Sequence, residues 1–160
     1  RVIRPDGVEI SVDTNDPLAT LGHLVQEDFC LLEGHILTAA VLCFPSRWML
    51  AEKLGRPLTR IHAPVQDYDA SVARRVERLF DGVQPGRPLW RWNALPTDEP
   101  VLFLPKSERE AQEKVNPEKA AFIRSERQVM WRLPRTRAVV FSIHTFLVRR
   151  PCRRCENAGS

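Results

Sequence analysis

The chain has 160 residues, of which 43% are hydrophobic and 28% are charged, and its formal net charge is +4. This composition is typical of one globular domain and excludes a chain that is disordered throughout. No apolar run approaches the length of about 18 residues that a transmembrane helix needs.

The first half of the chain predicts helices around a hairpin. Residues 1–17 contain Pro and Gly and predict irregular structure or short strands. Apolar positions 18, 21, 24 and 25 have helical spacing, and Asp16 is placed to cap that helix. Residues 29–44 predict a hairpin about Glu33-Gly34, and 46–55 predict a short helix that Gly55 ends. Apolar positions 72, 76, 79 and 80 predict an amphipathic helix over 68–83.

The second half predicts strands over residues 87–96, 100–105, 123–134 and 137–148, with the charged segment 106–120 as a loop or loose helix. Short links between most strands favour an α+β fold, in which helices lie on one face of an antiparallel sheet and a pocket can form between them. We expect one domain over 1–148 and a disordered basic tail over 149–160. Because the chain begins with Arg1 rather than Met, we also expect that part of the domain precedes it.

The four cysteines form no metal-binding pattern of the usual spacing. Cys30 and Cys43 lie in apolar segments and predict buried thiols. Cys152 and Cys155 form a single C-x-x-C in the tail, and a zinc site needs four ligands, so a structural metal there is the less favoured alternative. Nothing requires a disulfide, which indicates the cytoplasm.

One histidine is placed unlike the others. His62 lies between Pro57 and Pro64, which restrict the backbone on both sides. A fixed neutral imidazole can ligate a metal or haem iron or act as a general base, and it can also simply hydrogen-bond its own loop. The other histidines are scattered, which disfavours a site with several histidine ligands but is compatible with one axial haem ligand. His144, on a strand, is the competing ligand.

Arginine dominates the cationic side chains, since all but four of the 24 are arginine. Its planar fork suits paired carboxylates such as haem propionates, which makes some of these side chains candidate cofactor contacts: Arg47, Arg91, Arg127 and Arg132. A genomic codon bias, solvated strand faces or internal ion pairs with Glu52, Asp69 and Glu126 explain the same residues. Phosphate-binding loops and a G-x-S-x-G elbow are absent, and nucleic-acid binding has only the positive charge in its favour.

Several ordered blocks carry a resemblance to a known family: "LVQEDFCLL", "CFPSRW", "EKLGRPLTRIHAPV", "ERLF", "RWN" and "SERQVMWRLPRTRAVVFSIHTF". Together they resemble the haem-dependent oxidative N-demethylase alpha-subunit family, in order from about residue 17 to residue 148. Beyond this point the family pattern continues in register, whereas this chain continues as "LVRRPCRRCENAGS".

The resemblance implies a PAS-like sheet that binds haem b and acts as a monooxygenase-type oxidoreductase. Such enzymes oxidise a small methylated amine, typically a secondary amine such as dimethylamine, with dioxygen, and release formaldehyde. Electrons come from NADPH through FMN and an iron–sulfur cluster on partner subunits. The alternatives are a non-catalytic haem-binding PAS-like sensor or carrier, and a chain that has lost haem binding. Neither nucleic acid nor a membrane is an expected partner.

The resemblance also implies residue roles. His62 is expected to be the axial ligand of the haem iron. Arg47 and Arg127 are expected to contact haem propionates or the pocket. The remaining candidates are Arg91 and Arg132 as further cofactor contacts, and Glu126 and Glu52 as catalytic carboxylates near a cationic amine.

Overall fold

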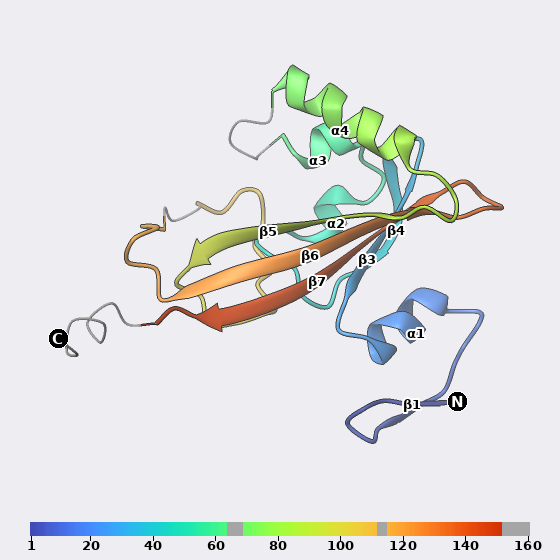
Figure 1. Ribbon diagram of the computed structural model, residues 1–160, viewed down its shortest axis with the longest axis horizontal. Helices are drawn as coiled ribbons and strands as arrows, with labels where there is room; N and C mark the ends of the chain where they lie inside the picture. The colour runs from blue at the N-terminus through green and yellow to red at the C-terminus, as the bar shows by residue number, and fades with distance from the viewer. Residues whose placement is uncertain (64–68, 112–114, 152–160) are drawn as a thin grey trace.

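The computed structural model describes residues 1–63, 69–111 and 115–151. A long antiparallel sheet of five strands, in the order β4-β3-β7-β6-β5, forms its centre, and β1 pairs with β2 in a separate small sheet (Figure 1). The elements are β1 (Val2–Ile3), β2 (Glu9–Ile10), α1 (Pro17–Leu24), β3 (Asp28–Glu33), β4 (Ile36–Val41), α2 (Leu50–Lys53), α3 (Leu58–Ile61), α4 (Ala70–Gly82), β5 (Leu89–Thr97), β6 (Phe122–Arg132) and β7 (Val139–Arg149).

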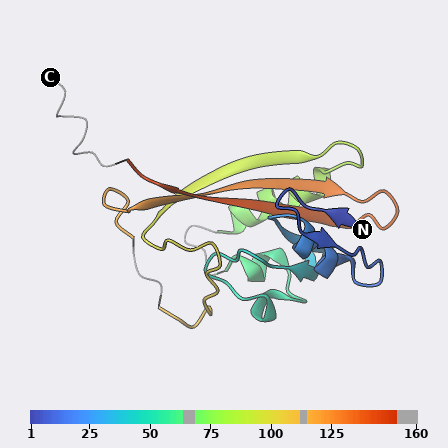
Figure 2. The ribbon, with the colours of Figure 1, turned by 90° about the horizontal axis from the view of Figure 1, so that it is seen from below.

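The helices divide between the two faces of this sheet. α2, α3 and α4 follow one another between the edge strands β4 and β5, and they lie on one face, which we call the inner face (Figures 1 and 2). α1 packs on the other, outer face, where Gly22 lies directly against Val41 of β4. The predicted α+β class with an antiparallel sheet is confirmed, and its arrangement fits the expected PAS-like sheet.

Local sequence signals account for the main helices and the hairpin. Asp16 caps α1 by accepting a hydrogen bond from the Ala19 amide at 3.2 Å, and Asp69 caps α4 through the amides of Ser71 and Val72. In the β3–β4 hairpin, Gly34 and His35 both have positive φ, 52° and 68°. Positive φ at both central residues is typical of a two-residue type I′ turn, which matches the twist of the paired strands.

The core lies between the inner face and the helices. It consists of buried apolar side chains that these elements bring together: Cys30, Leu32, Leu37, Leu58, Phe80, Val83, Met130 and Val139. On the outer face, α1 lies toward the β4 end, whereas Trp90 and Trp92 on the edge strand β5 remain 67% and 51% exposed. Trp92 stacks on Phe146 with 5.5 Å between ring centroids.

The register of β6 decides which side chains reach the inner face. Gln128 pairs with Ile143 of β7 and Arg91 of β5, and Glu126 pairs with Thr145 and Asn93. Because successive side chains of a strand point to opposite faces, Arg127 between them lies on the outer face.

The structure corrects two details of the predicted elements. Residues 100–105 form no strand; Leu104 makes one isolated bridge, to Ser46. The carbonyls of Val101 and Leu102 instead accept hydrogen bonds from Arg124, so they have no strand partner. The predicted helix over 46–55 shortens to the four residues of α2, and Gly55 follows it with φ of 75°.

Some predictions concern residues outside the description: Pro64, part of the 106–120 segment, and Cys152 and Cys155 in the tail. β7 continues through Arg149, one residue past the expected domain limit. None of the helices in the described ranges has the length and apolar character needed to cross a membrane.

Candidate functional site

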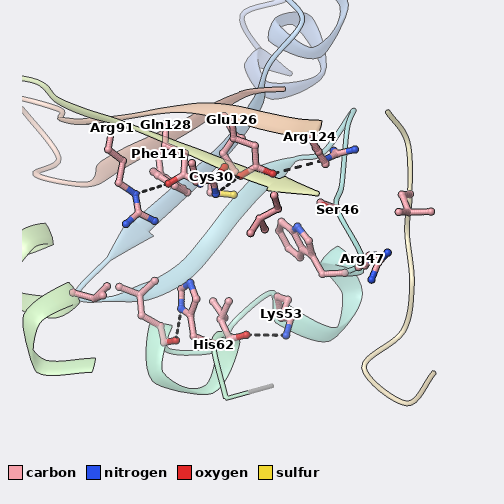
Figure 3. A pocket seen from close by; sticks show the side chains of 18 of the residues that line it. Cys30, Ser46, Arg47, Lys53, His62, Arg91, Arg124, Glu126, Gln128 and Phe141 are labelled. Atoms are coloured by element: carbon pink, nitrogen blue, oxygen red, sulfur yellow. Dashed lines mark hydrogen bonds and ion pairs between the residues drawn. The ribbon is translucent and has the colours of Figure 1, made fainter. Parts of the chain in front are cut away.

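A cavity of about 1060 Å³ lies between the inner face of the sheet and the helices α3 and α4. Its floor is formed by Leu58, Val72 and Val76 of the helices, and its roof by Met130 and Phe141 of the sheet (Figure 3). The cavity is within the size range of small-molecule and cofactor sites, which are typically apolar with a few oriented polar groups. This pocket brings together side chains that are far apart in the sequence.

His62 enters the pocket from the end of α3. Pro57 begins this single helical turn, and the His62 amide closes it by donating to the Leu58 carbonyl at 3.0 Å. The ring Nδ1 lies 2.9 Å from the same carbonyl oxygen. Since a carbonyl only accepts, Nδ1 carries the proton and the lone pair of the neutral ring is on Nε2. The ring rises from α3 toward the sheet (Figure 3).

The imidazole of His62 is held neutral. Burial lowers its pKa, the hydrogen bond to Leu58 raises it, and the positive charges of Lys53 and Arg91 lower it further. The net direction is downward from the usual value of about 6.5. A neutral imidazole whose Nδ1–H is held by a backbone carbonyl has the tautomer and orientation of metal-ligating histidines.

Four cationic side chains line the pocket: Arg47, Lys53, Arg91 and Arg124. Arg47 has a positive φ of 58°, and its amide donates to the Leu104 carbonyl at 2.7 Å. A non-glycine residue in the left-handed region is strained, and such residues cluster at functional sites. Arg91 donates from Nε to Oε1 of Gln128 at 2.6 Å.

Arg124 serves a structural purpose within the pocket wall. It is 6% exposed and donates to the carbonyls of Phe44, Val101 and Leu102 at 2.6, 3.3 and 3.0 Å. Burial lowers the pKa of this guanidinium, and the charges of Glu126 and Asp28 partly oppose that shift. The side chain therefore ties two loops to β6.

Glu126 is the carboxylate that faces the pocket from the sheet. Its Oε2 accepts hydrogen bonds from Asn93 Nδ2 at 3.2 Å and Gln128 Nε2 at 2.9 Å. Its Oε1 lies 3.7 Å from Arg124 Nε. The carboxylate is therefore held by amide donors on one oxygen.

Glu52 and Glu108 fasten the 107–110 turn to α2. Glu52 accepts from Ser107 Oγ at 2.5 Å and from the Glu108 amide at 3.0 Å, and these bonds lower its pKa. Glu108 pairs with Lys53 and with Arg60, whose hydrogen bonds lower its pKa as well. Lys53 is 4% exposed and also donates to the Ile61 carbonyl at 2.9 Å, next to His62.

The structure brings four of the sequence-predicted site residues into one pocket: His62, Arg47, Arg91 and Glu126. The other three lie elsewhere. Arg127 is on the outer face and pairs with Glu27 at 2.8 Å, beside the competing histidine, His144. Arg132 donates to the carbonyls of Phe80 and Val83 and so holds the end of α4. Glu52 binds the 107–110 turn.

Other pocket residues were missed from the sequence, chiefly Asn93, Gln128, Arg124, Lys53 and Glu108. One signal was available for two of them: Arg124, Glu126 and Gln128 alternate along a predicted strand and so share a face. The same period of two places Arg127 on the opposite face. No comparable signal exists for Lys53 and Glu108, because their contact joins segments 55 residues apart.

These residues fit a haem. The pocket is largely apolar, has one oriented neutral imidazole, and has arginines that suit the two propionates. Within the described ranges, no three His, Cys, Asp or Glu side chains are grouped to hold a metal ion directly. A single protein ligand to a cofactor-bound iron is the arrangement that the pocket offers.

Comparison with known families agrees with this chemistry. The model of the family described as haem-dependent oxidative N-demethylase, alpha subunit-like, matches residues 3–157. The match covers nearly the whole chain, including every pocket residue named above, and its description denotes one subunit of an assembly. The chain belongs to the haem-dependent oxidative N-demethylase, alpha subunit-like family.

Proposed function

We propose that this chain binds haem b through His62 and catalyses oxidative N-demethylation of a small methylated secondary amine. The observation that carries the proposal is the geometry of His62 in a large, mostly apolar pocket: Nδ1 donates to Leu58 O at 2.9 Å, which leaves the Nε2 lone pair as the ligating group. Family membership supplies the dependence on haem and the class of reaction.

The remaining cofactor contacts follow from position. Arg47 and Arg91 line the pocket and are the proposed partners of the haem propionates. Arg127 and Arg132 have a different proposed part, because their contacts with Glu27 and with the end of α4 stabilise the sheet that forms the pocket roof.

The reaction converts dimethylamine, dioxygen, two electrons and two protons into methylamine, formaldehyde and water. Bound haem supplies the activation of dioxygen and the oxidation of the methyl group. The chain itself binds, orients and excludes water. Glu126 accepts a hydrogen bond from the amine N–H, which places the methyl group in the apolar part of the pocket. Glu52 acts indirectly, because it holds the turn that positions Glu108 beside Lys53.

Electrons are proposed to come from NADPH through FMN and an iron–sulfur cluster on partner subunits. The family description, which denotes an alpha subunit, supports further chains in the assembly. Because NADPH is a cytoplasmic reductant, we place the assembly in the cytoplasm.

The proposal is tested by loading the purified chain with haemin. Spectra of the oxidised, reduced and carbon monoxide-bound protein are compared for wild type, His62→Ala and His144→Ala. We expect a Soret band that His62→Ala abolishes or strongly shifts and that His144→Ala leaves unchanged, since His144 lies on the outer face beside Glu27. The converse result moves the ligand to His144.

Turnover separates the enzyme from a haem sensor or carrier. The haem-loaded chain is given dimethylamine, dioxygen and a chemical reductant, and formaldehyde is measured. Formaldehyde that depends on amine and haem supports the demethylase. A protein that binds carbon monoxide but releases no formaldehyde is a sensor or carrier, and a wild type without a Soret band refutes the haem site itself.

A further inference from the structure

A row of polar side chains crosses the roof of the pocket above His62. From the edge strand inward, Arg91 donates to Gln128 Oε1 at 2.6 Å, and Gln128 Nε2 donates to Glu126 Oε2 at 2.9 Å. Asn93 Nδ2 donates to the same carboxylate oxygen at 3.2 Å. These side chains have neighbouring inner-face positions on β5 and β6, because Arg91 pairs with Gln128 and Asn93 pairs with Glu126 (Figure 3).

The chemistry of the row determines the orientation of the Gln128 amide. An arginine Nε–H can only donate, so the Gln128 atom that it contacts must be the carbonyl oxygen. The amide nitrogen therefore points toward Glu126, where a carboxylate can only accept. Gln128 is 5% exposed, and both ends of its amide are occupied within the row. Its amide consequently has one orientation.

The two oxygens of Glu126 differ as a result. Oε2 receives two amide hydrogen bonds, whereas Oε1 lies 3.7 Å from Arg124 Nε, beyond hydrogen-bonding distance. The Glu126 side chain retains 16% exposure and lines the pocket, and a carboxylate oxygen can accept more than one donor. Oε1 is thus the oxygen with capacity for a ligand N–H.

We propose that Gln128 is a positioning residue that, with Asn93, holds Glu126 so that Oε1 faces a cationic amine. This inference rests on the proposed function and identifies which atom receives the substrate and which residues orient it. Without the two amide donors, the carboxylate is free to rotate toward Arg124 and would pair with that guanidinium instead of the ligand. Gln128 orients Arg91 through the same amide, so one buried side chain arranges an acceptor and a cation together.

The test measures amine binding and haem binding separately. Haem-loaded wild type, Gln128→Met, Asn93→Leu, Glu126→Gln and the Gln128→Met/Glu126→Gln double variant are titrated with dimethylammonium by calorimetry. Gln84→Met is the matched control, because Gln84 is exposed and its amide contacts a turn carbonyl away from the pocket. Haem affinity and the carbon monoxide spectrum are recorded for each variant.

We expect Gln128→Met to weaken dimethylammonium binding about tenfold and Asn93→Leu about threefold, with haem affinity and the carbon monoxide spectrum unchanged. In the Glu126→Gln background, Gln128→Met is expected to have no further effect, because it acts through that carboxylate. If Gln128→Met fails to fold, Asn93→Leu makes the same comparison.

Two results overturn the inference and leave the haem site standing. One is wild-type haem protein that does not bind dimethylammonium. The other is Gln128→Met binding the amine as Gln84→Met does, or its loss multiplying with that of Glu126→Gln. A wild type without a Soret band instead refutes the proposed function, so the two failures are distinguishable.

Discussion

Replacing Arg124 with methionine is expected to destabilise the fold far more than the same change three residues away. The Arg124 guanidinium donates to three loop carbonyls, those of Phe44, Val101 and Leu102, and is 6% exposed. Methionine has a similar length but no donors, so Arg124→Met removes all three hydrogen bonds. Arg127→Met is the matched control on the outer face, where the side chain is 43% exposed and pairs with Glu27.

The magnitude follows from opposing contributions. A hydrogen bond from a charged donor stabilises a protein by about 1.5 kcal/mol at the low end of its range, so three bonds correspond to about 4.5 kcal/mol. Burial of the charge opposes this, as the lowered pKa of Arg124 indicates, and its removal returns about 1.5 kcal/mol or more. We expect a net loss of about 3 kcal/mol for Arg124→Met. Arg127→Met should lose less than about 1 kcal/mol, as for a partly exposed ion pair.

Urea unfolding of both variants and the wild type measures the difference. With a denaturant slope of about 2 kcal/mol per molar, Arg124→Met should move the midpoint down by about 1.5 M and Arg127→Met by less than about 0.5 M. Equal shifts for the two variants, or a loss below about 1 kcal/mol for Arg124→Met, would refute the role of this guanidinium as the tie between the loops and the sheet.

Further predictions concern α1 and the 107–110 turn. A methyl group on Gly22 would lie 2.9 Å from Val41 Cγ2, so Gly22→Ala should lower the free energy of unfolding by about 1–2 kcal/mol, visible as a lower thermal midpoint. Ala19→Gly, in the same helix without that close approach, should cost only about 1 kcal/mol through lost helix propensity; a stabilised Gly22→Ala would contradict the tight packing. The lowered pKa values of Glu52 and Glu108 mean that both stabilise the turn above their unfolded value of about 4.3 and lose that effect as pH falls through their folded values. Hydrogen exchange of the Glu108 amide, after correction for the intrinsic rate, should therefore accelerate relative to core amides below about pH 4, and Glu52→Gln should show no such acceleration. Unchanged relative protection in the wild type between pH 5 and 3 would count against the role of these carboxylates.

Elements with local signals were predicted well. The helix that Asp16 caps, the hairpin about Glu33-Gly34 and the helix that ends near Gly82 each depend on caps, turn residues or periodicity within a short segment. Residues 100–105 failed for a non-local reason: an apolar run between prolines resembles a strand, but its carbonyls bind Arg124, more than 20 residues away. The prediction of one short turn before His62 held, since Pro57 begins the turn and His62 follows it.

The sequence by itself determined the α+β class, the antiparallel strands, the family and the choice of His62 as the residue to test, because caps, alternation and ordered motifs act over short distances. The tertiary structure alone decided which charged residues share the pocket. Register placed Glu126 and Gln128 on the inner face and Arg127 on the outer face, and folding brought Lys53 to Glu108. A site depends on which face a side chain occupies and which loop reaches it. Both are determined by strand pairing and packing between distant segments.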